Sequence, residues 1–177
     1  SARPIEGIRL TGHEPVTLDL LRRVHDPAYV DAVRTGDPRA LAESQGFTWD
    51  PALWEMVCAS NGGVVAGARA ALEHGVSGAL ASGLHHAHRA HGAGFCTFNG
   101  LALAATALHL TSDARVLVLD LDAHCGGGTH ELLGDNSAVR IADIAVNPFD
   151  TYPPRGANTL ELVVRAEHYL PTLGARL

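Results

Sequence analysis

Three titratable side chains stand at alternate positions where an apolar stretch of the chain ends. The apolar run 116–119 leads into Asp120, Asp122 and His124, and a run of three glycines follows soon after. Residues two apart on a strand point to the same face, so these side chains should converge near the end of the strand. Carboxylate and imidazole together suit Zn²⁺ or a similar divalent ion. The spacing predicts a metal site. The structural alternative is that the aspartates cap a helix and the histidine is satisfied in the core.

A second group of titratable side chains lies in a stretch rich in histidine. Four histidines fall within seven residues, at His85, His86, His88 and His91. An imidazole titrates near neutral pH, so a pair of histidines beside a metal-bound water suits general acid–base catalysis. His85 and His86 are adjacent and can face one atom only if they lie on a loop. We expect His88 and His91 to be exposed at the surface.

The elements that must position these residues alternate along the chain. Strands are predicted at 79–82, 115–122, 139–146 and 159–164, and helices at 17–24, 27–34, 51–74, 99–110 and from 129 and 166 onward. The alternation predicts an α/β fold with a mostly parallel sheet and helices on both faces. We expect 116–122 to be an inner strand that helix 51–74 covers. Ligands bind at the carboxyl ends of such strands, so both groups of titratable residues should meet at one edge of the sheet.

The length and composition of the chain limit the classes of protein to which it can belong. The chain has 177 residues, of which 46% are hydrophobic, and this is enough for a single domain over 1–177 with a real core. The formal net charge of −6 and the lack of a basic run argue against direct binding of nucleic acid. Three scattered cysteines do not form a disulfide framework and favour a cytoplasmic location. No apolar run is long enough for a membrane span.

Two motifs together resemble one known family. The stretch "SGLHHAHRAHGAGFCTFN" followed by "RVLVLDLDAHCGGGT" is similar to the zinc-dependent histone deacetylase and acetylpolyamine amidohydrolase family, and the segment 22–33 resembles a helix near its start. The resemblance implies an arginase-like α/β fold. It also implies a hydrolase that removes acetyl or similar acyl groups from an amine, with acyl-lysine or acetylpolyamine as substrate. In such a reaction zinc polarises the acyl carbonyl and activates a water molecule.

The resemblance also assigns roles by motif position. It implies that Asp122 and His124 are zinc ligands. It implies that Asp120 hydrogen-bonds His85 and helps to hold a monovalent cation such as K⁺. His86 matches the second histidine of the family, which acts as base and acid. The wall of the substrate channel corresponds to Gly94 and Phe95.

The sequence departs from the family pattern at several points. Cys125 replaces a histidine, and Gly127 replaces the acidic or amide residue that orients the second histidine. We therefore expect His86 to lack a carboxylate partner. The family's third zinc ligand, an aspartate, and its oxyanion tyrosine belong to motifs that are absent here. The sequence thus resembles the central portion of a deacetylase without its two ends.

These departures leave three functional hypotheses. The chain can be part of an active enzyme that another segment, a complementary chain or a homo-oligomer completes. It can be a catalytically incompetent relative that serves as a binding module. A weaker third hypothesis is an arginase-type manganese site, which needs more carboxylates than the motifs supply.

Overall fold

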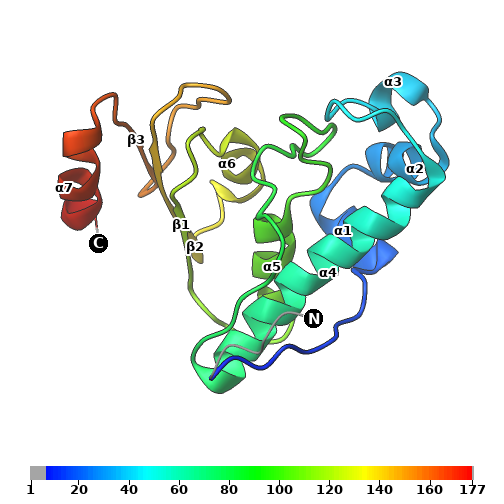
Figure 1. The fold of residues 1–177 in the computed structure, drawn as a ribbon, viewed down its shortest axis with the longest axis horizontal. Helices are drawn as coiled ribbons and strands as arrows, with labels where there is room; N and C mark the ends of the chain where they lie inside the picture. Colours follow the sequence, from blue (N-terminus) through cyan, green and yellow to red (C-terminus); the bar gives the residue numbers. More distant parts are fainter. Residues whose placement is uncertain (1–6, 177) are drawn as a thin grey trace.

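The computed structural model describes residues 7–176. In chain order its elements are α1 Leu18–Val24, α2 Pro27–Thr35, α3 Arg39–Ala42, α4 Pro51–His74, α5 Gly100–His109, β1 Val116–Asp120, α6 Gly127–Leu133, β2 Val139–Ala145, β3 Thr159–Leu162 and α7 Ala166–Arg176. Figure 1 shows an N-terminal helical part followed by a small sheet with its helices. The predicted strand at 79–82 is wrong, because this stretch forms no strand and Leu80 is 97% exposed.

Capping side chains decide where several helices begin. Four of them accept a hydrogen bond from a backbone N–H in the first turn of their helix: Thr17, Asp26, Asp50 and Asn99. Gly36 and Gly75 end α2 and α4 with positive φ angles of 79° and 83°, which glycine adopts at no steric cost. The helix boundaries predicted from these signals agree with the structure to within one residue for α2 and α4.

The three strands form one parallel sheet in the order β1-β2-β3. Its central strand is β2, and Asp120 at the end of β1 pairs in register with Asp143 of β2. Within the described residues β1 is an edge strand, and Leu117 and Leu119 are 55% and 37% exposed. The prediction of an inner strand at 116–122 is therefore wrong. An apolar run does not report how many strands flank it, and its expected neighbour at 79–82 is not a strand.

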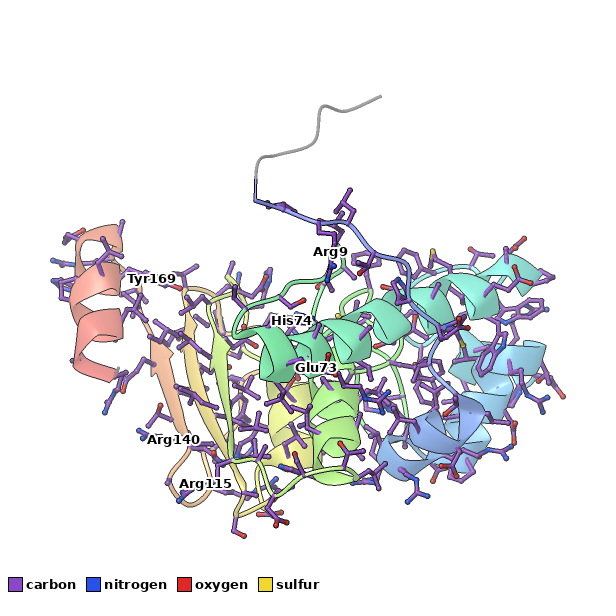
Figure 2. The ribbon with its side chains drawn as sticks, turned by 90° about the horizontal axis from the view of Figure 1, so that it is seen from below. Arg9, Glu73, His74, Arg115, Arg140 and Tyr169 are labelled. Atoms are coloured by element: carbon purple, nitrogen blue, oxygen red, sulfur yellow. The ribbon has the colours of Figure 1, made fainter. Side chains whose placement is uncertain are left out.

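Helices cover both faces of the sheet, as predicted. One side carries α7, and the other carries α5 and α6 (Figure 1); the view from below in Figure 2 shows the same layers. The core lies between the sheet and the helices α1, α2, α4 and α5. Because α4 packs chiefly on α5, the prediction that it directly covers β1 is wrong. Gly62 lets the N-terminal segment cross α4 closely, since a Cβ there would lie 2.2 Å from the carbonyl oxygen of Glu14.

The sequence also predicts no membrane span and no disulfide framework. Among residues 7–176, no helix combines the length and apolarity that crossing a membrane requires. Cys58, Cys96 and Cys125 are free thiols, and all three are buried. This agrees with the expectation that they form no disulfide framework.

Candidate active site

The histidine loop, residues 83–98, is held through its backbone. Asn99 caps α5, is fully buried, and donates from Nδ2 to the carbonyl oxygens of His85 and Ala87 at 3.3 and 3.2 Å. The backbone N–H of Thr129 in α6 donates to the carbonyl oxygen of His85 at 3.0 Å. These bonds fix the backbone on both sides of His86. Two adjacent histidine side chains can therefore point in fixed directions without regular secondary structure.

His25 supports the loop from the helical side. Its Nδ1 lies 2.8 Å from the carbonyl oxygen of His88, to which it can only donate, and its Nε2 accepts from the N–H of Asn99 at 3.0 Å. These partners require a neutral ring, and burial lowers the pKa of His25 to about 4. His25 lies in the segment 22–33 that resembles a helix of the family, but the sequence does not reveal that its ring is buried and bonded on both nitrogens.

Acid should destabilise the fold through His25. The pKa of His25 is about 4 in the folded chain and near 6.5 in the unfolded chain, so between these values the unfolded state binds more protons. Stability is thus lost as the pH falls below 6.5, by about 2–3 kcal/mol between about pH 7 and about pH 4.5. Urea unfolding should show a smaller loss for His25→Gln and an unchanged loss for the exposed control His74→Gln. An equal loss in His25→Gln would contradict the assignment.

The first predicted dyad is confirmed. Asp120 accepts a hydrogen bond from Nδ1 of His85 at 2.6 Å, and both side chains are buried. Burial disfavours the charged imidazole, but the hydrogen bond and charge of Asp120 outweigh it and raise the pKa of His85. The dyad joins the end of β1 to the histidine loop.

The prediction that His86 lacks a carboxylate partner is wrong. Nδ1 of His86 donates to Oδ2 of Asp150 at 2.9 Å, and Asp150 comes from the loop after β2. Burial raises the pKa of Asp150, but hydrogen bonds from His86 and His88 outweigh burial and lower it to about 2. The expectation failed because it considered only the motif position, Gly127, and not a side chain from another loop.

His88 is not a surface residue, in contrast to the prediction. Its Nε2 lies 3.1 Å from Oδ1 of Asp150 and its Nδ1 2.6 Å from Oε2 of Glu131, and its side chain is 17% exposed. Because both ring nitrogens face carboxylates, both must donate, so the ring is an imidazolium. The bond to Asp150, aided by Glu131, raises the pKa of His88 to about 9 against the opposing effect of burial. His88 could have been identified from the sequence because it lies only two residues after His86, a residue already assigned to the site.

The two residues that the resemblance identifies as zinc ligands lie together at the open end of β1. Oδ1 of Asp122 is 3.2 Å from Nδ1 of His124, and these side chains are 53% and 43% exposed. Two ligand atoms that each lie about 2.0–2.1 Å from a tetrahedral zinc are about 3.3 Å apart. Burial raises the pKa of Asp122, but the backbone N–H of His124 and the nearby imidazoles outweigh burial and lower it. The pair fits a shared divalent ion.

The described residues do not provide a full set of zinc ligands around this pair. His85, His86 and Asp122 offer ligand atoms that all lie within 4.8 Å of one another. In the part of the chain that the structure describes, no third carboxylate joins Asp122 and His124 in such a group. The described part of the chain therefore supplies a carboxylate and an imidazole, with the histidine pair directly beside them.

Aromatic side chains flank the histidines. Gly94 and Phe95 adopt positive φ angles of 52° and 63°, and a Cβ on Gly94 would lie 2.4 Å from the ring of His86. Phe95 is 64% exposed. Phe149 packs edge-on against His86 and His124 at centroid distances of 4.9 and 5.9 Å. Sequence analysis missed Phe149, which belongs to the same loop as Asp150.

Two tyrosines and one further carboxylate lie close to the dyads. Tyr152 donates its hydroxyl to Oδ2 of Asp143 at 3.0 Å, and Tyr169 donates to the carbonyl oxygens of Leu121 and Ile144. Burial, reinforced by Asp120, raises the pKa of Asp143 to about 6. Both hydroxyls are thus engaged with groups at the carboxyl ends of β1 and β2.

Comparison with known proteins supports the resemblance. The sequence matches the histone deacetylase domain family over residues 4–170. It is 36% identical over 121 residues to an uncharacterized protein of Picosynechococcus, covering 67% of this chain and 40% of that protein. It is 32% identical over 142 residues to the acetoin utilization protein AcuC of Bacillus subtilis, covering 74% and 35%. The fold is similar to that of an HDAC homolog from Aquifex aeolicus, with a TM-score of 0.75 at 23% identity, covering 90% of this chain and 49% of that one.

The matches differ in how much of each protein they cover. The chain spans less than half the length of each of these three relatives. The family match, in contrast, covers nearly all of the chain and includes both histidine–carboxylate dyads. The chain therefore belongs to the histone deacetylase domain family.

Proposed function

We propose that this chain carries the central part of the active site of a zinc-dependent deacetylase, which removes acetyl or similar acyl groups from the amine of a lysine side chain or a polyamine. The observation that carries the proposal is the grouping of two histidine–carboxylate dyads beside Asp122 and His124. Membership of the family supports a hydrolase of the deacetylase type. The three buried free thiols favour a reducing compartment, and we propose a cytoplasmic location.

The two histidines have different parts in this proposal. His86 donates from Nδ1 to Asp150, so its Nε2 is left to accept a proton from water and to return it to the leaving amine. Asp120 raises the pKa of His85 above that of an ordinary imidazole, so His85 keeps its proton to higher pH. A protonated His85 can stabilise negative charge that develops on the substrate. The exposed rings of Phe95 and Phe149 flank the route by which the aliphatic arm of an acylated amine would reach them.

Asp122 and His124 would hold the metal. Zinc bound there would polarise the acyl carbonyl and lower the pKa of a bound water. Catalytic zinc sites normally take three protein ligands, so we propose that another segment, a complementary chain or a second copy supplies the third. A monovalent cation such as K⁺ beside Asp120 is a separate part of the proposal. Its support is Asp143, whose buried Oδ1 has no hydrogen-bond partner among the described residues.

A second candidate function is a catalytically incompetent module that binds acylated amines without hydrolysing them. The observation in its favour is that, among residues 7–176, no third carboxylate accompanies Asp122 and His124. The two candidates differ in whether acetate is released.

The test is hydrolysis of an acetyl-lysine peptide and of an acetylpolyamine by the intact protein supplied with Zn²⁺. We expect acetate release, at least about 10²-fold lower in Asp122→Ala because a charged ligand is lost. The matched control is Asp113→Ala, an exposed aspartate in the turn before β1, which should leave the rate unchanged. Binding of both substrates without release of acetate would favour the second candidate, and release unaffected by Asp122→Ala would overturn the metal assignment.

A further inference from the structure

The loop after β2 delivers a carboxylate to the second histidine of the site. Asp150 accepts from Nδ1 of His86 at 2.9 Å and from the backbone N–H of Gly128 at 3.2 Å, both through Oδ2. Its other oxygen, Oδ1, accepts from Nε2 of His88 at 3.1 Å. The Asp150 side chain is 12% exposed. The three hydrogen bonds that this carboxylate accepts thus come from the histidine loop and from the start of α6.

The space that Asp150 fills is the space that a side chain at Gly127 would need. A Cβ built on Gly127 would lie 2.3 Å from Oδ1 and 2.6 Å from Cγ of Asp150, and 2.5 Å from its backbone carbonyl oxygen. Such distances are far inside van der Waals contact, so a side chain at position 127 cannot coexist with the Asp150 side chain in this place and would also require the backbone of residue 150 to shift. Asp150 also adopts a φ of 60°, a left-handed conformation that aspartate tolerates better than most residues. The loop therefore accepts a less favoured backbone conformation where it brings the carboxylate to His86.

His88 and Glu131 hold this carboxylate from the opposite side. Glu131 faces Nδ1 of His88 at 2.6 Å and also accepts from the backbone N–H of Arg89 at 3.0 Å. The imidazolium of His88 lies between Glu131 and Asp150 and neutralises part of the charge of both. Asp150 is consequently fixed in place, and its Oδ2 remains available for His86.

We propose that Asp150 is the positioning residue of His86, and that it replaces from the β2 loop the side chain that Gly127 lacks. This inference rests on the proposed function, in which His86 moves protons. By accepting from Nδ1, Asp150 keeps the proton on that nitrogen and leaves Nε2 free toward the reacting atoms. It also sets the orientation of the ring, which packs against the rings of His85 and Phe149.

The Asp150→Asn variant separates positioning from a merely structural role. Asparagine keeps the shape and tolerates the left-handed backbone. The His88 imidazolium will donate a hydrogen bond to the amide oxygen of the new side chain. The NH₂ group of that side chain will then face Nδ1 of His86 and donate to it, so the proton of the His86 ring will move to Nε2. We expect ¹⁵N NMR of the intact protein to show this change of tautomer. We also expect kcat to fall by roughly 10²–10⁴-fold with KM little changed, as when the orienting aspartate of a serine-protease triad becomes asparagine. Asp135→Asn, at an aspartate that is 78% exposed, is the matched control and should change neither measurement.

Moving the carboxylate from position 150 to position 127 tests whether its place beside His86 is what matters. Gly127→Asp alone should unfold at lower temperature than the parent, because its side chain collides with Asp150. In the double variant Gly127→Asp with Asp150→Gly, the side-chain collision is removed, and glycine lets the backbone at position 150 shift its carbonyl oxygen away from the new Cβ, so we expect the Nδ1–H tautomer and much of kcat to return. An unchanged His86 tautomer in Asp150→Asn would overturn the proposal. The tautomer is read without turnover, so a protein that shows the tautomer change but hydrolyses no acylated amine would refute the proposed function and leave this inference standing.

Discussion

The 177-residue chain on its own should bind zinc only weakly, with a dissociation constant of roughly micromolar or above. The motif supplies two ligands, Asp122 and His124, whereas catalytic zinc sites normally take three protein ligands and a water. Losing a charged ligand removes one bond and part of the negative charge that offsets the metal. Both side chains are about half exposed, so their own hydration competes with the ion. Calorimetric titration of the purified chain with Zn²⁺ measures the affinity directly.

Substitutions identify which residues carry this weak binding. Asp122→Ala should remove detectable binding, and Asp113→Ala should leave it unchanged, since Asp113 lies in an exposed turn. Stoichiometric binding at nanomolar affinity that Asp122→Ala abolishes would refute the prediction. It would mean that a further carboxylate, such as Asp143 or Asp150, moves to complete the ligand set.

Asn99→Ala should lower the free energy of unfolding by about 3–5 kcal/mol, which is large for one substitution. Its Nδ2 donates to the carbonyls of His85 and Ala87 and to Oγ1 of Thr129, and its Oδ1 accepts from the N–H of Ala102. Truncation leaves the carbonyl oxygen of Ala87 and the N–H of Ala102 buried without the side-chain partner they have here, at about 1–3 kcal/mol for each unsatisfied group before any relaxation, whereas the His85 carbonyl keeps its bond from Thr129. Chemical unfolding measures the loss.

The control is an exposed asparagine whose side chain also accepts one backbone hydrogen bond, in the turn before β2. Asn136 is exposed and accepts from the N–H of Ala138 at 3.0 Å, so Asn136→Ala should cost about 1 kcal/mol or less. Hydrogen exchange should also show faster exchange in the histidine loop of Asn99→Ala and not of Asn136→Ala. A loss in Asn99→Ala no larger than that of the control would show that the loop is held by other contacts.

Local signals in the sequence were sufficient for most of the elements. Asp26 and Asp50, each followed by proline, predicted where α2 and α4 begin, because capping depends on residues a few positions apart. The neighbours of each strand could not be predicted in the same way. The place of β1 at the edge of the described sheet and the packing of α4 on α5 depend on contacts between distant parts of the chain.

The site residues also differ in whether local sequence signals could predict them. The bond between His85 and Asp120 was predictable because both residues lie in recognisable motifs. The role of Asp150 was not, because it lies in a loop with no motif and its partner His86 is 64 residues away. His25 and Asn99 were missed as supports of the loop, since a buried polar residue reveals its function only through its hydrogen-bond partners.

The collision between a side chain at 127 and Asp150 constrains how such a site can evolve. If the carboxylate moves from one position to the other one substitution at a time, the intermediate has either two carboxylates in one space or none beside His86. Both intermediates are unfavourable, the first through overpacking and the second through loss of the histidine's partner. The two positions are therefore epistatic. Among aligned relatives, an acidic residue at one of them should accompany a small or uncharged residue at the other.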